Sequence, residues 1–325
     1  MGPIYENSLV KLYCGDCLTV MPELDIKFDC CITDLPYGLT DCKWDNTIPF
    51  EPMWDNLKRL IRQNGAICLF GQEPFSSKLV CSQLEGFSHS WVWIKKSSAG
   101  FLNSKKMPLK THENINVFYV NDTALQKYFV ESKKQSLLTN KQINKILGST
   151  LKGGGLSSHY WGKTQFIIPT RDKYDKLYAV GFFDLSYDEM RKRYQVFDRV
   201  FNPQKTEGKP YQQKQCGTSH IYNKKVKIEI VNNGDRCPIS WLMFNRDTPS
   251  FHSTQKPVAL IEYLIKTYTN ENNIILDFTA GSGTTGVAAM ETNRKAVLIE
   301  QDEKYCEITI NRLKDKEKEI EERLF

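Results

Sequence analysis

The stretch Ile274-Ile-Leu-Asp277-Phe-Thr-Ala-Gly281-Ser-Gly283-Thr-Thr-Gly286 decides the fold class of this chain. Its apolar start predicts a buried strand over 274–277, and the residues that follow predict a helix over 284–291 and a second strand over 295–300. The three glycines satisfy the G-x-G-x-x-G spacing between strand and helix. Glycine permits a sharp turn and close approach of a ligand, and the helix N-terminus favours negative charge. The pattern therefore predicts an α/β fold with a nucleoside site.

An acidic residue completes this half of the pattern. Glu300 ends the second predicted strand, where its carboxylate can accept hydrogen bonds from both hydroxyls of a ribose. NAD and S-adenosylmethionine both carry an adenosine, so this half of the chain is compatible with either cofactor.

A second turn follows another predicted strand, Phe28–Thr33. It has the sequence Asp34-Leu35-Pro36-Tyr37-Gly38. A carboxylate, a stiff turn and an aromatic ring at the carboxyl edge of a sheet make a site for a planar amine. The alternative is an ordinary turn with a solvated Asp34, because Asp-x-Pro also begins many turns.

Three segments together resemble one enzyme family. Residues 34–38 resemble the D-P-P-Y-G catalytic motif of amino-directed DNA methyltransferases, and 277–286 resemble their D-P-F-x-G-S-G-T-T-G cofactor loop. His252-Ser-Thr-Gln-Lys-Pro257 resembles their H-P-T-Q-K-P segment. The catalytic motif precedes the cofactor loop, with an insertion between them, as in the β class of these enzymes. The resemblance covers about residues 9–120 and 236–312.

Some positions depart from the family pattern. Leu35 stands where the family has its first proline, although the carbonyl needed there belongs to the backbone. Phe278 and Thr279 stand where the family has Pro and then Phe. Residues 158–174 are similar to phage-type members.

The resemblance implies a circularly permuted class I S-adenosylmethionine-dependent methyltransferase fold, Rossmann-like, with an inserted target-recognition region. The implied domains are a catalytic half (1–120), a basic target-recognition insertion (121–235) and a cofactor-binding half (236–325). The implied catalytic residues are Asp34, Leu35, Pro36 and Tyr37. The implied residues for S-adenosylmethionine are Asp16, Thr254, Lys256, Asp277, Phe278, Gly281, Ser282, Gly283, Thr284 and Glu300.

The implied reaction methylates an exocyclic amine of a base flipped out of double-stranded DNA. An Asp at position 34 favours adenine N6, because cytosine-N4 enzymes of the family usually have Ser there. Cytosine N4 is the alternative on the same fold. Two other classes, a NAD-dependent oxidoreductase and an inactive DNA-binding protein, stay open. Dimerisation is common among relatives, so a homodimer is possible, and the chain identifies no partner restriction nuclease.

Charge is distributed unevenly along the chain. Residues 121–227 hold 20 Lys and Arg against 9 Asp and Glu, whereas the remainder holds 24 against 29. A basic central segment flanked by acidic segments is typical of an insertion that binds a polyanion. A solvated, lysine-rich surface is the other interpretation.

The composition excludes several classes of protein. The 325 residues are 40% hydrophobic and 25% charged, which argues against collagen-like, disordered and coiled-coil chains. No run of about 18 uncharged apolar residues exists, and the start lacks the apolar core of a signal peptide, so we expect a cytoplasmic protein without a membrane partner. Cys14-Gly-Asp-Cys17 has no second such pair, so no metal site is predicted. Cys30, Cys31 and Cys68 are expected to be small buried hydrophobes.

Periodicity and capping residues predict the remaining elements. The predicted strands are Leu9–Tyr13, Ala66–Phe70, Ser90–Ile94 and Asn114–Val120, and the predicted helices are Pro52–Arg62 (stopped by Gly65), Thr139–Leu147, Pro257–Tyr268 and Asp302–Phe325. Ser186-x-x-Glu189 predicts a helix start, followed by Met190, Tyr194, Phe197 and Phe201 on one face. Residues 202–222 are predicted to form a mobile loop.

Overall fold

The structure, a computed structural model, describes residues 2–38, 46–120, 123–148, 156–162, 166–194, 198–219, 224–248, 251 and 255–324. The chain divides into two compact units. One contains residues 1–120, 198–204 and 238–325, and the other contains 121–197 and 205–237. None of the helices in the described part of the chain combines the length and apolar character needed to cross a bilayer.

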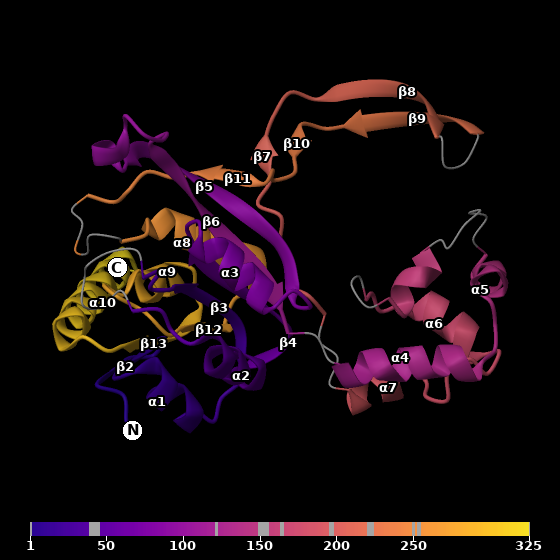
Figure 1. The fold of residues 1–325 in the computed structure, drawn as a ribbon, viewed down its shortest axis with the longest axis horizontal. Coiled ribbons are helices and arrows are strands. Elements are labelled where there is room, and N and C mark those ends of the chain that lie inside the picture. Colours follow the sequence, from indigo (N-terminus) through magenta and orange to yellow (C-terminus); the bar gives the residue numbers. More distant parts are fainter. Residues whose placement is uncertain are drawn as a thin grey trace. The chain divides into compact units, whose positions relative to one another are not determined.

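The first unit is built on one mixed sheet, which its described residues form in the order β1-β2-β13-β12-β3-β4-β6-β5-β11 (Figure 1). The strands from β2 through β4 in this order are parallel to one another, β1 and β6 run antiparallel to their neighbours, and β5 pairs in parallel with β11. The strands are β1 (Tyr5–Glu6), β2 (Val10–Cys14), β3 (Phe28–Asp34), β4 (Ile61–Gly71), β5 (Phe87–Ala99), β6 (Lys110–Tyr119), β11 (Trp241–Met243), β12 (Ile274–Asp277) and β13 (Lys295–Glu300).

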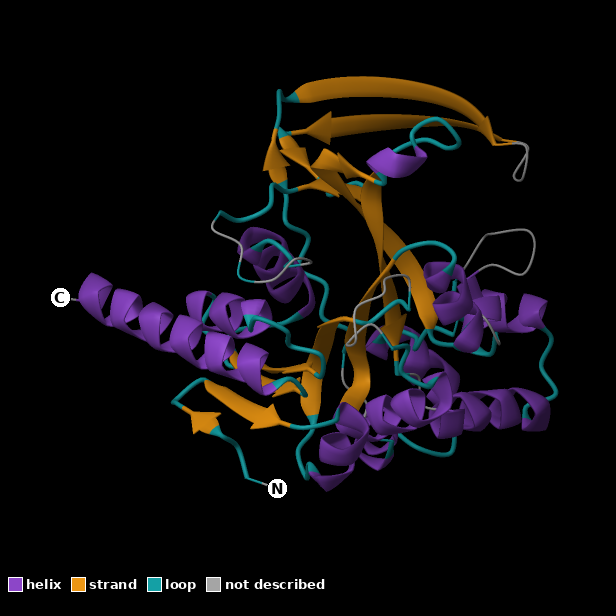
Figure 2. Ribbon diagram, turned by 60° about the vertical axis from the view of Figure 1, so that its left-hand side comes forward, coloured by secondary structure: helices purple, strands orange, loops and turns teal. Residues whose placement is uncertain are grey.

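Helices cover both faces of this sheet, as Figure 2 shows for its orange strands. They are α1 (Cys17–Glu23), α2 (Phe50–Leu60), α3 (Phe75–Ser82), α8 (Val258–Tyr268), α9 (Thr284–Glu291) and α10 (Glu303–Leu324). The short η1 (Phe101–Asn103) lies between β5 and β6 and covers neither face. Successive residues of a strand point to opposite faces. Accordingly Cys30 and Ile32 pack in the core beneath α8 and α9, whereas Cys31 packs with Met53 and Leu57 of α2. Both apolar faces of the sheet are therefore buried.

The strand order reverses between β12 and β3. From β3 the chain continues to β4 on one side, and from β12 it continues to β13 on the other. In open α/β sheets, ligands bind in the crevice at the carboxyl ends of the strands at such a switch point. Asp34 ends β3 and Asp277 ends β12, so the fold brings both sequence motifs to this crevice.

The second unit has a helical part and two strand pairs. The helices are α4 (Thr123–Gln135), α5 (Asn140–Ile146), η2 (Leu156–Tyr160), α6 (Arg171–Tyr178) and α7 (Tyr187–Arg193), and the strands are β7 (Thr206–Glu207), β8 (Tyr211–Ser219), β9 (Lys224–Asn232) and β10 (Asp235–Arg236). An aromatic core holds the helices together, and the rings of Tyr174 and Phe183 stack at 4.2 Å within it. Met190, which the sequence placed on one face with aromatic residues, is fully buried in this core, so at Met190 that face serves local packing.

Several sequence predictions are confirmed, and others are corrected. The helix start at Ser186 and the burial of Cys30, Cys31 and Cys68 are confirmed. The helix predicted from Thr139 is also present, and capping boxes begin both helices. Gly65 does not stop a helix, because α2 already ends at Leu60 and Gly65 lies inside β4. Pro257 precedes α8 as its cap rather than forming its first residue. Phe201 lies beyond α7 and packs its ring against Tyr268, and Phe197 is outside the described residues.

The largest correction concerns residues 202–222. Where a loop was predicted, β7 pairs with β10, and β8 pairs with β9 over Tyr211–Ser219. The polar sequence of β8 carries no strand periodicity of its own. Strand pairing supplies its backbone with hydrogen-bond partners in β9, a non-local effect that a window of sequence does not contain.

Candidate active site

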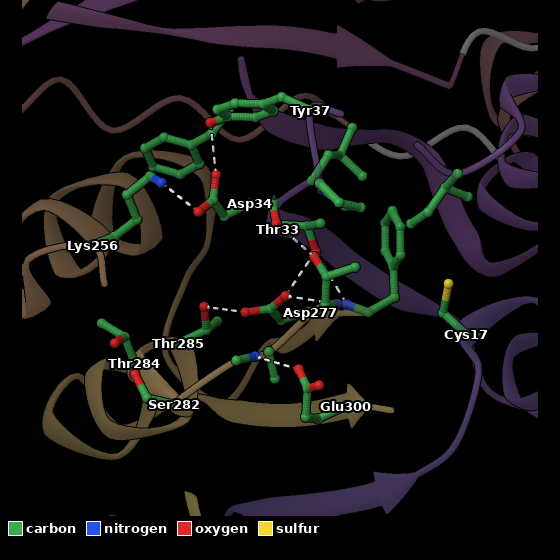
Figure 3. Close-up of a pocket in the computed structure, with 18 of the residues that line it drawn as sticks. Cys17, Thr33, Asp34, Tyr37, Lys256, Asp277, Ser282, Thr284, Thr285 and Glu300 are labelled. Carbon is green, nitrogen blue, oxygen red and sulfur yellow. Dashed lines mark hydrogen bonds and ion pairs between the residues drawn. The ribbon is translucent and has the colours of Figure 1, made fainter. Parts of the chain in front are cut away.

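The turns that follow β3 and β12 are joined by hydrogen bonds. The Thr279 hydroxyl donates to the backbone carbonyl of Asp34 at 2.9 Å, and the Thr33 hydroxyl donates to Asp277 Oδ1 at 2.9 Å. The amide of Phe278 donates to the Thr33 hydroxyl oxygen at 3.1 Å. The two motifs, far apart in the sequence, thus form one structure (Figure 3).

A cavity of about 570 Å³ opens where these turns meet. Its size suits a nucleoside-sized ligand. Its lining includes most of the sequence-predicted site residues: Asp16, Asp34, Leu35, Pro36, Tyr37, Lys256, Asp277, Phe278, Gly281, Ser282, Thr284 and Glu300. Thr254 is outside the described residues.

Asp34 is the last residue of β3, and its side chain is 25% exposed. The Tyr37 hydroxyl donates to Asp34 Oδ1 at 2.7 Å, and the Lys256 ammonium pairs with Oδ2 (Figure 3). Burial raises the pKa of the Asp34 carboxyl above its usual value, and the nearby Glu113 carboxylate adds to this rise. Lys256 and Tyr37 act in the opposite direction. Because each carboxylate oxygen has two lone pairs, Asp34 can still accept a further hydrogen bond.

Behind Asp34 lies a buried chain of alternating charges. Lys256 also pairs with Glu113 Oε2 at 3.3 Å, and Glu113 Oε1 pairs with Lys95. The side chains of these three residues are 6–9% exposed. Such buried charges are stable only when paired. The order Lys95, Glu113, Lys256, Asp34 therefore links β5 and β6 electrostatically to the turn that follows β3.

The pKa values in this chain of charges follow from burial and pairing. Burial disfavours ionised Glu113, but Lys256 and Lys95 outweigh it and hold its pKa below the usual value. Burial acts to lower the pKa of Lys256, yet the carboxylates of Asp34 and Glu113 raise it overall. Burial lowers the pKa of Lys95, with Glu113 opposing. Lys256 is thus a fixed positive charge beside Asp34.

The rest of the turn that follows β3 is anchored in the core. Leu35 is buried among the residues that pack α1, α2 and α3 on the sheet. The ring of Tyr37 is half-buried and lies 5.3 Å from the ring of Phe75 at 33°. The turn therefore holds its backbone and its aromatic ring in one place at the cavity wall.

Both carboxylate oxygens of Asp277 accept hydrogen bonds from the protein itself. Its Oδ1 accepts from the Thr33 hydroxyl and from the amide of Thr279 at 3.2 Å, and its Oδ2 accepts from the Thr285 hydroxyl at 2.6 Å. Burial raises the pKa of Asp277 to about 6, and these hydrogen bonds oppose the rise. In this structure Asp277 fastens the glycine loop to both strands.

The glycine loop needs two left-handed residues. Gly281 has φ +54° and Gly283 has φ +75°. A Cβ on Gly283 would lie 2.5 Å from Thr309 Cγ2, whereas one on Gly281 would meet nothing within 4 Å. Position 283 is thus closed by packing, and the backbone at Gly281 is open at the cavity.

Glu300 and Asp16 stand on the same side of the cavity as this loop. Glu300 Oε2 accepts the Gly281 amide at 2.7 Å, and Oε1 accepts the Asp302 amide at 2.9 Å. Burial raises the pKa of Glu300. Asp16 caps α1 by accepting the Leu18 amide at 2.7 Å. Both carboxylates line the cavity and retain lone pairs for a ligand.

Several residues at the site were not predicted from the sequence. Thr33 and Thr279 tie the two turns together, and Thr285 bonds Asp277 within the second motif. Lys95 extends the buried charges. Arg312 of α10 donates to the Ser282 and Thr284 hydroxyl oxygens at 3.1 and 3.2 Å. Threonines beside a motif and a basic residue in a charged helix carry no distinctive sequence signal. The burial of Cys17, which raises the pKa of its thiol to about 12, was likewise not predictable from the sequence.

The sheet order and the cavity at its switch point define a class I S-adenosylmethionine-dependent methyltransferase fold, circularly permuted. The DNA methylase family (N6_N4_Mtase) matches residues 28–311, and the chain belongs to this family.

Individual proteins are similar to this chain in sequence or in fold. The type II methyltransferase M2.LlaDCHI of Lactococcus lactis subsp. cremoris is 45% identical over 98 residues, which cover 29% of this chain and 36% of that relative. The chain thus spans about a third of that relative's length. Among solved structures, the M1.HpyAVI–SAM complex has a TM-score of 0.51 at 18% identity, covering 94% of this chain and 100% of that one. PvuII DNA methyltransferase (cytosine-N4-specific) also has a TM-score of 0.51, at 12% identity, covering 96% and 88%.

Proposed function

We propose that this protein transfers a methyl group from S-adenosylmethionine to the exocyclic amine of a base in double-stranded DNA, and that the base is adenine. The observation that carries the proposal is the meeting of the two motif turns at one cavity, where the Thr279 hydroxyl bonds the Asp34 carbonyl. A donor site and an acceptor site so joined can hold two reactants together. Such proximity contributes roughly 7–11 kcal/mol in well-oriented reactions.

The residues of the glycine loop fit an adenosine-bearing cofactor. The open backbone at Gly281 leaves room for a ligand, and the lone pairs of Glu300 can accept ribose hydroxyls. Asp16 offers a further acceptor on the cavity wall. When bound, S-adenosylmethionine supplies an electrophilic sulfonium methyl group. Asp277 acts in this proposal by holding the loop rather than by touching the ligand.

Asp34 acts on the base. An exocyclic amine is a poor nucleophile, because its lone pair is delocalised into the ring. Asp34 carboxylate and the Leu35 carbonyl would accept the two amine hydrogens and favour a pyramidal, more electron-rich nitrogen, which is electrostatic preorganisation. Lys256 supports this role by favouring the ionised form of Asp34. The Tyr37 ring would stack on the base, as its fixed place at the cavity wall suggests.

The preference for adenine rests on Asp34, since Asp at this motif position goes with adenine in the resembling family. The proposed target-recognition region is 121–235, between a catalytic half (1–120) and a cofactor-binding half (236–325). Its excess of Lys and Arg supports contacts with phosphates. The compact unit of residues 121–197 and 205–237 also supports a separate role for this region.

The test uses purified protein, S-adenosylmethionine labelled in its methyl group, and unmethylated genomic DNA. We expect label in DNA with the wild type and its loss with Asp34→Ala, which removes both acceptor oxygens. Cofactor binding by calorimetry should persist in this variant. Asp25→Ala changes an exposed residue outside the cavity lining; it is the matched control and should retain activity.

Two readouts decide between the candidates. Mass spectrometry of the nucleosides separates N6-methyladenine from N4-methylcytosine, and only the first supports adenine. Tight NADH binding without label transfer would instead support an oxidoreductase. Label transfer that survives Asp34→Ala would refute the role given to Asp34.

A further inference from the structure

The β5–β6 hairpin ends in an exposed apolar tip. Leu102 is 99% exposed and Phe101 is 79% exposed, both in η1, and Met107 nearby is 50% exposed. Large apolar side chains exposed together at the tip of a hairpin commonly mark an interaction site. The tip is nevertheless ordered by its own backbone, since the amides of Asn103 and Ser104 donate to the carbonyls of Gly100 and Phe101 at 2.9 and 3.0 Å.

This tip projects from the edge of the sheet that carries the catalytic turn. β6 runs antiparallel to both β4 and β5, so β5 runs in the same direction as β4 and β3. The carboxyl end of β5 therefore lies at the same edge as Asp34 (Figure 1). Lys95 and Ala99, both in the C-terminal part of β5, line the cavity itself.

The tip is also basic. Lys96, Lys105, Lys106 and Lys110 are exposed, and no Asp or Glu occurs from 96 through 112. Lysines complement the phosphates of a duplex, and an apolar side chain complements the faces of stacked bases. A target base that enters the cavity leaves a gap in its stack, so an apolar wedge beside the cavity has a defined place to go.

We propose that Leu102, with Phe101, inserts into the DNA stack and stabilises the duplex with the target base extruded, while the surrounding lysines contact the flanking phosphates. This inference rests on the proposed function. An anionic lipid surface also attracts lysines and apolar side chains, but the position of the tip beside the cavity favours DNA.

The experiment compares single-turnover methyl transfer on two duplexes with the recognition sequence found by methylome sequencing. In one, the target base is paired; in the other, the opposite position is abasic, so that extrusion is already easy. Leu102→Ala is expected to slow the paired duplex by about tenfold or more and the abasic duplex by less than about threefold. Leu84→Ala is the matched control, an exposed leucine (64%) just before the other end of β5, and should slow neither.

The outcomes separate the two proposals. If the wild type methylates neither duplex, the proposed function fails. If the wild type methylates both, and Leu102→Ala slows both equally or neither, the wedge is overturned. Wild-type sedimentation with phosphatidylserine vesicles that is lost in Leu102→Ala would also overturn it, in favour of a membrane contact. Equal thermal unfolding of wild type and Leu102→Ala will confirm that the fold is intact, as expected for a side chain that is almost fully exposed.

Discussion

Replacing Lys256 by methionine removes the positive charge beside Asp34 but keeps most of the side-chain volume. An opposite charge within about 4–6 Å lowers a carboxyl pKa by about 1–3 units in proteins. Burial and Glu113 already raise the pKa of Asp34, and Lys256 is the largest influence opposing them. The pKa of Asp34 should therefore rise in Lys256→Met, and a higher pH should be needed to ionise it.

The assay is the pH dependence of single-turnover methyl transfer. In the proposed mechanism ionised Asp34 accepts the amine hydrogens, so activity should fall as pH drops through its pKa. In Lys256→Met this acid limb should move to higher pH by about one to three units, and the rate on the limb should fall about tenfold per unit. Lys256→Arg keeps the charge and should hold the limb near its original place.

Glu113 provides a control of opposite sign. Its carboxylate raises the pKa of Asp34, so Glu113→Gln should move the acid limb to lower pH. General damage to the site would lower activity in both variants without moving their limbs in opposite directions. A limb that stays in place in Lys256→Met, or moves the same way in both variants, would refute the electrostatic account of Asp34.

Three further predictions concern the glycine loop. Gly283→Ala should lower the free energy of unfolding by about 2–4 kcal/mol, because φ is +75° and the new Cβ would meet Thr309 Cγ2 at 2.5 Å; unchanged chemical denaturation would contradict this. Burial raises the pKa of Asp277 from 3.8 to about 6, so protonation favours the folded state; the free energy of unfolding should fall by about 3 kcal/mol as pH rises from about 4 to 6, and Asp277→Asn should abolish that slope. Arg312→Met should weaken S-adenosylmethionine binding about 3- to 30-fold in calorimetry with kcat little changed, whereas Lys314→Met, the charge-matched control, should leave binding unaltered.

The sequence predicted those strands whose signal is local. β12, α9 and β13 were predicted with their observed bounds, because a buried apolar run, a glycine turn and a second apolar run succeed one another without a break. β5 was predicted as Ser90–Ile94 but extends over Phe87–Ala99. Its polar end lacks strand periodicity and pairs through Ala99 with Lys110 of β6. Such pairing lengthens a strand beyond its own signal.

The chain of buried charges illustrates what lay beyond the sequence. Lys256 was predicted to approach the cofactor, and the structure pairs it with Asp34 and Glu113. Glu113 lies in β6 and Lys95 lies in β5, so both are far from Asp34 in the sequence. The side-by-side pairing of β3, β4, β6 and β5 in one sheet, with the segment before α8 that carries Lys256, brings these side chains together.

By itself, the sequence determined the turn chemistry of each motif: glycines for left-handed backbone, carboxylates at strand ends, and a stiff aromatic turn at 34–38. These features depend on neighbours along the chain and are therefore visible in it. The tertiary structure alone decided how each group is used. It assigned the oxygens of Asp277 to threonines and set a buried lysine beside Asp34. Hydrogen-bond partners and burial depend on distances between remote residues, and only the packed sheet fixes those distances.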